Sequence, residues 1–218
     1  MLKSNKIDIN LNIYLNYILP MKRDAKGVIH FEDFPEFKPN LTPREMFEKG
    51  SFGGTYWRPI YSEIVNKDLK NQHRSKKWDV NKIFEGLDDS ILTKSKYHTK
   101  TNKYKVKVGQ SLQEWEKDRK GGSWIQEDDP YGWVQWYCRF YNGRRLKNGE
   151  DERQILRWAG IASERGRFRR WLVTLILKKD AEWDDSKVSP AIRQTLQHWA
   201  YELTKEDYEK DVKRREEE

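Results

Sequence analysis

The fold is decided by residues 131–141, which read YGWVQWYCRFY. Within this stretch the rings recur at spacings of three and four residues, which places them on one face of an α-helix. Asp129-Pro130 supplies an expected cap and a proline for the first turn, and Asn142-Gly143 ends the pattern. The sequence therefore predicts a helix whose buried face is aromatic, formed by Trp133, Trp136, Tyr137, Phe140 and Tyr141.

Similar signals predict further helices on both sides of this one. Acidic residues at 150–152 suit the positive end of a helix that carries Ile155 and Trp158 on its apolar side. Other helix starts are expected at capping residues that precede apolar stripes, namely Thr42, Ser111, Ser163 and Ser189.

The chain is predicted to be mainly α, a compact multi-helix single domain with an aromatic-rich core. We expect the helical core domain to span residues 31–204. Residues 1–30 would form an N-terminal extension, and residues 205–218 a charged C-terminal helix or tail. Alternating apolar residues make short strands possible near residues 7–19 and 104–108. The Asn and Lys density of the first stretch fits a loosely held arm equally well.

The composition narrows the class of protein. The 218 residues carry a formal net charge of +8, and ten Trp, eleven Tyr and eight Phe are available to build a core. No run of about 18 apolar residues is present, so no membrane span is expected, and residues 1–20 lack the core of a signal peptide. Because there is one cysteine and the four histidines are far apart in the sequence, we expect no internal disulfide, metal or cofactor. We expect an intracellular protein.

Positive charge is concentrated between residues 131 and 179. This segment holds twelve basic and four acidic residues, so its excess equals the net charge of the whole chain. Nine of the twelve are arginines, whose planar guanidinium suits bidentate contact with phosphate. We predict a phosphate-binding surface formed by Arg144, Arg145, Arg153, Arg157, Arg165, Arg167, Arg169 and Arg170. The alternative is a solvated face that pairs with acids such as Glu152, Glu164, Asp184 and Asp185.

The loop at residues 50–58 is the most site-like local feature. Two adjacent glycines allow a close approach of backbone to a ligand, and the residues after them add rings and a charge. The predicted ligand loop consists of Gly53, Gly54, Tyr56, Trp57 and Arg58, with an ordinary structural turn as the alternative. Further rings outside the helical stripes that could stack on a base are Phe52, Trp124 and Tyr131.

Five blocks of sequence stand out together. They are residues 34–44 (FPEFKPNLTPR), 50–61 (GSFGGTYWRPIY), 131–141, 151–158 (DERQILRW) and 189–199 (SPAIRQTLQHW). They resemble a family of proteins from fungi, algae, plants and large DNA viruses. The resemblance covers about residues 34–204 and implies an intracellular protein, which a virus could encode. It implies no activity, cofactor or catalytic residue.

These observations favour an intracellular protein that binds nucleic acid through an arginine-rich helical surface on phosphates. One alternative is an enzyme acting on a nucleic-acid base or strand, like a glycosylase or nuclease. Another is a non-catalytic scaffold or host-interaction protein. The enzyme would draw on a carboxylate among Asp128, Asp129, Asp151, Glu152, Asp184 and Asp185, and no catalytic residue is assigned. Cys138 is expected to be inert, with His198 as its sole candidate base.

Overall fold

The elements of the fold are mostly short helices joined by long loops. The computed structural model describes residues 21–117 and 124–217 and is 46% helical. The α-helices are α2 (Pro43–Glu48), α3 (Val80–Phe84), α4 (Leu112–Lys117), α5 (Trp133–Tyr141), α6 (Glu150–Ala162), α7 (Arg167–Lys178), α8 (Pro190–His198) and α9 (Lys205–Glu217). The single-turn 3-10 helices are η1 (Phe52–Gly54), η2 (Gln72–Arg74), η3 (Lys77–Asp79), η4 (Asp89–Ile91) and η5 (Thr99–Thr101).

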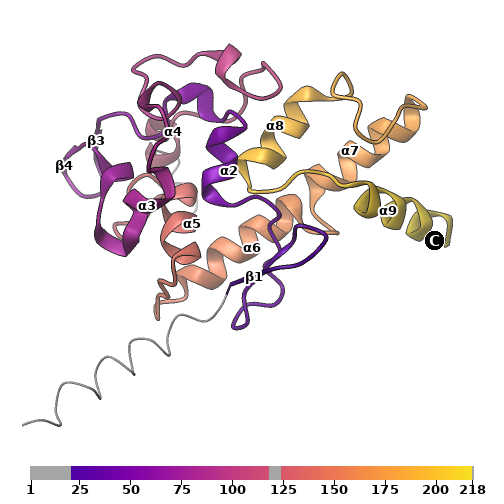
Figure 1. Ribbon diagram of the computed structural model, residues 1–218, viewed down its shortest axis with the longest axis horizontal. Coiled ribbons are helices and arrows are strands. Elements are labelled where there is room, and N and C mark those ends of the chain that lie inside the picture. The colour runs from indigo at the N-terminus through magenta and orange to yellow at the C-terminus, as the bar shows by residue number, and fades with distance from the viewer. Residues whose placement is uncertain (1–20, 118–123, 218) are drawn as a thin grey trace, which may run out of the picture.

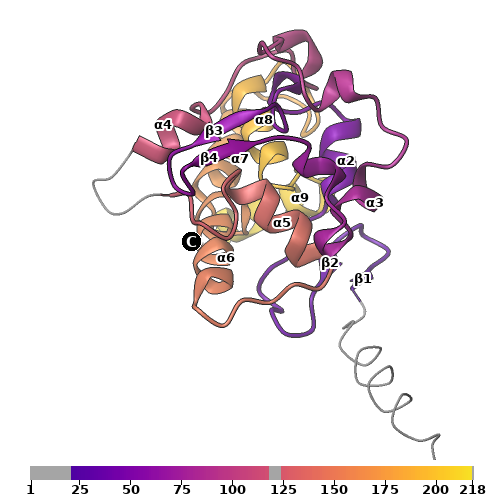
Figure 2. The same ribbon diagram turned by 90° about the vertical axis from the view of Figure 1, so that its left-hand side faces the viewer.

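Two small antiparallel hairpins accompany the helices in the described part of the chain. Strand β1 (Lys22–Arg23) pairs with β2 (Ile29–His30), and β3 (Ile60–Ser62) pairs with β4 (Lys67–Leu69). Figure 1 shows α5 and α6 at the centre, with α7 and α9 on one side and the β3–β4 hairpin on the other. Figure 2 brings α4 and this hairpin to the face turned toward the viewer.

Helix α5 lies in the core, as the spacing of its rings predicts. Trp136, Tyr137 and Phe140 are all 0% exposed. Phe37, which comes from the extended segment before α2, is also fully buried. Its ring centroid lies within 6.1 Å of the rings of Phe31, Trp133, Trp136, Tyr137, Phe140 and Trp158. Aromatic pairs at such separations contribute about 0.5–1.5 kcal/mol each beyond the area they bury.

The strand predicted at residues 104–108 is wrong, and a turn stands in its place. Lys105 has a φ of +56°, which no strand residue adopts, and its N–H donates to the carbonyl of Asn102. The Asn102 side chain also donates to the carbonyl of Val106, so a buried amide organises this turn. The strand considered near residues 7–19 lies outside the described residues.

A buried ion triad joins the segment before α5 to the loop after it. Asp129 is 1% exposed, and its carboxylate accepts hydrogen bonds from Arg139 and Arg144 at 2.9 Å each. The expectation that Asp129 caps α5 is wrong, because Gly132 occupies the cap position. The Asp129 carboxylate is needed here because both arginines would otherwise be buried without a counterion.

Both ends of the described chain pack against the domain. Ile29 in β2 is 1% exposed, and its N–H donates to the carbonyl of Pro39. At the other end, Asp211 in α9 is 1% exposed and pairs with Arg215 at 2.9 Å. The guanidinium of Arg215 also donates to the Thr174 hydroxyl of α7 at 2.9 Å. Among residues 21–117 and 124–217, no helix is both long and apolar enough to cross a membrane.

The triad predicts a strong effect of removing its carboxylate. Asp129→Asn should lower the free energy of unfolding by about 3–5 kcal/mol, because two buried guanidinium groups lose their counterion. Asp33→Asn is the matched control, since Asp33 pairs with Arg145 at a partly exposed position and should cost no more than about 1 kcal/mol. Urea unfolding of both variants measures the difference. Equal losses would contradict the role given to the triad.

Candidate functional site

A cavity of about 450 Å³ opens on the side of the molecule that carries α4. Its walls come from residues 52–58, 95–115 and 124–134, with Arg157 of α6 and the C-terminal end of α8 completing it. The volume lies within the range of about 300–1,000 Å³ that is typical of small-molecule sites. Segments far apart in the sequence therefore meet in one concave site.

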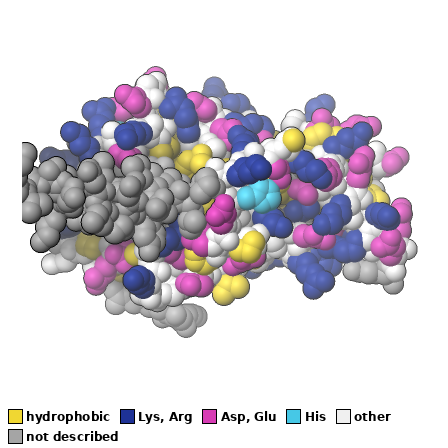
Figure 3. All heavy atoms as spheres, turned by 60° about the horizontal axis from the view of Figure 1, so that its bottom comes forward, with side chains coloured by type: hydrophobic (Ala, Val, Ile, Leu, Met, Phe, Trp, Pro, Cys, Tyr) yellow, Lys and Arg dark blue, Asp and Glu magenta, His cyan; other side chains and the backbone are white. Residues whose placement is uncertain are grey.

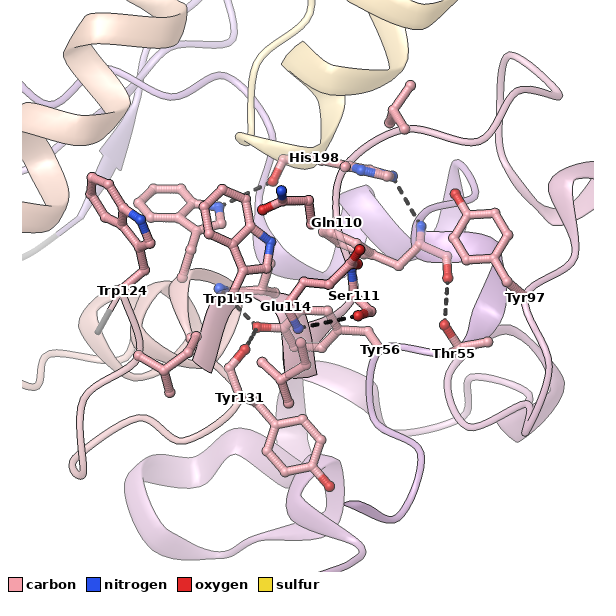
Figure 4. A pocket seen from close by; sticks show the side chains of 18 of the residues that line it. Thr55, Tyr56, Tyr97, Gln110, Ser111, Glu114, Trp115, Trp124, Tyr131 and His198 are labelled. Carbon is pink, nitrogen blue, oxygen red and sulfur yellow. Dashed lines mark hydrogen bonds between the residues drawn. The ribbon is translucent and has the colours of Figure 1, made fainter. Parts of the chain in front are cut away.

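Aromatic side chains line much of this cavity, which we call the aromatic pocket. Figure 4 shows Trp115 and Trp124 on one side and Tyr97 on the opposite side. Trp115 and Trp124 meet edge to face with ring centroids 6.2 Å apart, and Trp124 is 38% exposed. Other lining rings are Phe52, Tyr56, Tyr131, Trp133, His198 and Trp199. Exposed ring faces in a pocket are suited to stacking on a planar ligand.

Arg157 places a positive charge among these rings. Its guanidinium carbon lies 4.7 Å from the ring centroid of Trp124 and 5.3 Å from that of Trp199. The side chain donates to the Gln154 amide oxygen at 2.8 Å, and no carboxylate of the described residues forms an ion pair with it. Burial, with repulsion from Arg153, lowers the pKa of Arg157 to about 10. The guanidinium is charged at neutral pH, and its charge is not neutralised by an ion pair.

The remaining charges of the aromatic pocket are Arg58, Lys107 and Glu114. Glu114 is exposed, and its carboxylate accepts the backbone N–H of Ser111 at the start of α4. This hydrogen bond lowers the pKa of Glu114. With three cations and one carboxylate among the described residues, the lining favours an anionic ligand over a cationic one.

A lysine-rich segment borders the aromatic pocket. Residues 93–110 contain no acidic residue and six lysines, Lys94, Lys96, Lys100, Lys103, Lys105 and Lys107. Lys103 pairs with Glu202, whereas Lys96, Lys100 and Lys107 are exposed and form no ion pair with the described residues. This signal is missed when charges are counted over residues 131–179 alone. A window of about 18 residues moved along the whole chain would find it.

The predicted glycine loop is filled by protein rather than by open space. The carbonyls of Gly53 and Gly54 accept the N–H groups of His98 and Lys94, at 3.1 and 2.7 Å. A Cβ added to Gly53 would lie 2.5 Å from the ring of Tyr97. The two glycines therefore let residues 90–102 approach closely. They shape the wall of the aromatic pocket by positioning Tyr97.

The two rings of this loop hold the fold and do not offer free faces. Trp57 is 0% exposed. The Tyr56 hydroxyl donates to the carbonyl of Tyr131 and accepts the N–H groups of Val134 and Gln135 at 3.1 and 3.3 Å. Tyr56 therefore positions the start of α5, and burial raises its pKa well above the ordinary value. We do not assign base stacking to either ring.

His198 is part of the pocket wall and is held in its neutral form. Its Nε2 accepts the N–H of Phe52 at 3.0 Å, and the two rings are stacked with centroids 3.9 Å apart. Burial lowers the pKa of His198 to about 3. Since the single basic nitrogen of a neutral imidazole is already an acceptor here, His198 is not available as a general base.

The eight predicted arginines divide among separate environments. Arg144, Arg145 and Arg169 pair with acids distant in sequence, Asp129, Asp33 and Asp207 respectively. Because they neutralise carboxylates within the fold, we do not assign them to a phosphate-binding surface. Arg153 pairs with Glu150 at 2.6 Å beside the aromatic pocket, and Arg157 lies inside it.

The remaining three arginines, Arg165, Arg167 and Arg170, lie at or just before the start of α7. They are exposed and form no ion pair with the described residues. Figure 3 shows one face of the molecule on which basic and acidic side chains are interspersed rather than separated.

Two of the carboxylates considered for catalysis, Asp129 and Asp151, are engaged in hydrogen bonds within the fold. Asp151 is fully buried and accepts hydrogen bonds from the Trp136 indole and the Leu146 N–H, both at 2.7 Å. Asp129 belongs to the ion triad. Cys138 is 0% exposed, and burial raises the pKa of its thiol. Among the residues that the structure describes, no three His, Cys, Asp or Glu side chains are grouped closely enough to hold a metal ion.

No family model matches this chain, and no curated protein or solved structure is significantly similar to it.

The low pKa of His198 predicts a pH-dependent stability. The unfolded chain takes up a proton near pH 6.5, whereas the folded chain does so near pH 3, so stability is lost as the pH falls through this window. The slope from this group is about 1.4 kcal/mol per pH unit. Urea unfolding at pH 7 and pH 5 should show a smaller loss for His198→Gln than for the wild type. His98→Gln, at an exposed position, should behave as the wild type does. Equal losses in all three would contradict the assignment.

The contact with Tyr97 predicts a specific cost at Gly53. Gly53→Ala should destabilise more than Gly86→Ala, although both positions have a positive φ. Gly86→Ala should cost only the backbone strain of a positive φ, about 1–2 kcal/mol. A Cβ at Gly86 adds no steric contact, since it meets nothing within 4 Å. Gly53→Ala adds displacement of the Tyr97 ring, about 1–3 kcal/mol for overpacking. Equal destabilisation in urea would show that Tyr97 moves freely.

Proposed function

We propose that this protein binds nucleic acid and receives one unpaired base in the aromatic pocket. The observation that carries the proposal is the juxtaposition of partly exposed rings with cations that form no ion pair with the described residues. Trp115 and Trp124 provide the rings, Arg157 provides the charge inside, and Lys107 of the lysine-rich segment provides a charge at the rim. Proteins that bind single strands combine these two features, a basic path for phosphates and aromatic platforms for bases.

The two kinds of contact have different energetic roles. A base stacked on an aromatic side chain is worth about 1–3 kcal/mol and does not depend strongly on salt. Lysines on phosphates release counterions, so their contribution falls as salt increases. Lys96, Lys100 and Lys107 are exposed, extended by four-carbon stems and close in sequence to pocket-lining residues, which suits them to the second role. Neither contact requires a particular base sequence.

The exposed arginines near the start of α7 are a second, separate element of the proposal. Arg165, Arg167 and Arg170 form no ion pair with the described residues and can reach a phosphate. We propose that they extend the contact with a longer strand. The single cysteine fits a role in a reducing, intracellular compartment. Catalysis is not part of the proposal, because Glu114, the one carboxylate that lines the pocket in the described part of the chain, is exposed and has a lowered pKa.

The proposal predicts separable losses in strand binding. In fluorescence anisotropy, a labelled single-stranded oligonucleotide should bind the wild type with an affinity that falls steeply from 50 to 300 mM salt. Trp124→Ala should weaken binding about 5- to 100-fold at every salt concentration. The triple variant Lys96→Ala/Lys100→Ala/Lys107→Ala should make the log–log salt slope shallower by about 2, at about 0.7 per phosphate on single strands.

The matched control removes three exposed lysines that lie outside the lysine-rich segment and do not line the pocket. Lys178→Ala/Lys179→Ala/Lys187→Ala lowers the net charge equally and should leave the slope nearly unchanged. A duplex of the same sequence should bind more weakly, because its bases are stacked on each other. If no oligonucleotide binds the folded protein at 50 mM salt, or if the two triple variants lose affinity equally, the pocket-centred proposal fails.

A further inference from the structure

Arg157 is half-buried, and its partners differ from those of the buried arginines in the described part of the chain. Arg139, Arg144 and Arg169 are each at most 7% exposed, and all three pair with a carboxylate. Arg193, also buried, donates instead to the backbone carbonyls of Val188 and Trp183. The guanidinium of Arg157 has the Gln154 oxygen at 2.8 Å as its one hydrogen-bond acceptor among the described residues.

A guanidinium with one neutral acceptor has unused donors. It carries five N–H groups, so most of them are directed at solvent or at a ligand. The loss of hydration is costly for a charge and is ordinarily offset by a counterion. The rings of Trp124 and Trp199 offset part of the cost through cation–π contact and also restrict the guanidinium in position. We infer that the aromatic pocket is built for a nucleoside phosphomonoester, with Arg157 binding the phosphate and the rings stacking on the base.

The location of Arg157 favours a terminal phosphate over one inside a strand. Arg157 lies within a concave site, so its partner must enter the pocket. An internal phosphodiester can enter only if the strand comes in and leaves again, whereas a phosphomonoester ends the chain there. A phosphomonoester also carries between one and a half and two charges near pH 7, since its second pKa is about 6. Its three terminal oxygens suit the fork of an arginine.

Other ligand classes fit the lining less well. A cation is disfavoured because Arg58, Lys107 and Arg157 outnumber Glu114. Inorganic phosphate would leave the rings of Trp115 and Trp124, which line the pocket, without a stacking partner. A neutral planar molecule would not compensate the charge of Arg157. A planar ring joined to a phosphomonoester uses both features at once.

The phosphomonoester can come from a strand end or from a free mononucleotide, and the strand-end form of the inference rests on the proposed function. Three versions of one single-stranded oligonucleotide distinguish the groups, with a 5′-phosphate, a 3′-phosphate or hydroxyls at both ends. The four nucleoside monophosphates and the matching nucleosides provide the free forms. Isothermal titration measures affinity, and quenching of tryptophan emission reports that the pocket is occupied.

We expect one terminal phosphate to raise the affinity of the strand roughly ten- to hundredfold over the hydroxyl form, as charge-assisted hydrogen bonds do. Arg157→Gln should abolish this advantage while leaving the hydroxyl strand within a few-fold of the wild type. Arg157→Lys keeps a charge without the fork and should retain part of it. The advantage should shrink between pH 7.5 and pH 5, because the phosphomonoester gains a proton. Arg74→Gln, which removes an exposed guanidinium outside the pocket, is the control and should change nothing.

The outcomes separate this inference from the proposed function. If strands bind but hydroxyl and phosphate ends bind equally, the inference is overturned and the proposed function stands. If mononucleotides bind through Arg157 and no strand binds, the pocket assignment stands and the proposed function falls. If neither binds the wild type, both are overturned. Circular dichroism spectra and urea unfolding of Arg157→Gln and Arg157→Lys confirm that losses arise in the folded state.

Discussion

The packing of aromatic rings around Phe37 is the constraint on which the rest of the structure depends. In a chain of 36% hydrophobic residues, these rings supply much of the buried apolar area. Burying the N–H of an indole ring is costly unless the N–H has an acceptor. Trp136 donates to Asp151 of α6, and Trp158 donates to the carbonyl of Trp199 just after α8. Ring packing therefore holds α5, α6 and α8 against one another, and the indole hydrogen bonds fix how the rings are oriented.

The aromatic pocket is an outer extension of this core. Trp133 is 8% exposed, its indole donates to the carbonyl of His198 at 3.1 Å, and its ring lies 4.6 Å from that of Trp199. Trp133 thus belongs to the core cluster and to the pocket wall at once. Arg157 lies against Trp199 on the same wall. Because this wall is held by core packing, its geometry exists before any ligand binds, which reduces the ordering cost of binding.

Local sequence patterns correctly predicted helices, which depend on neighbouring residues. They did not predict contacts between residues that are distant in sequence. Periodic rings located α5, and capping residues located α2 and α8, because these signals act within one or two turns. No local pattern indicated that Asp129 would bind Arg144 rather than cap a helix. That pair forms only because the loop after α5 folds back against the segment before it. The residues of the pocket were predicted separately, not as one site. Trp124 and Arg157 were both predicted, but for separate sites, and no pattern indicated that α6 and the segment before α5 bring them within 4.7 Å.

Some positive side chains pair with carboxylates within the fold, and others do not. Several arginines of residues 131–179 receive a carboxylate and become structural, so the local charge excess overstates the free charge there. The lysine-rich segment at residues 93–110 contains no acidic residue, and its Lys96, Lys100 and Lys107 form no ion pair with acidic residues elsewhere in the described chain. The positive charge that stays available to a ligand therefore lies where the fold places no carboxylate beside a described lysine or arginine. The edge and interior of the aromatic pocket are such places, and there a phosphate would complete a charge balance that the protein leaves open.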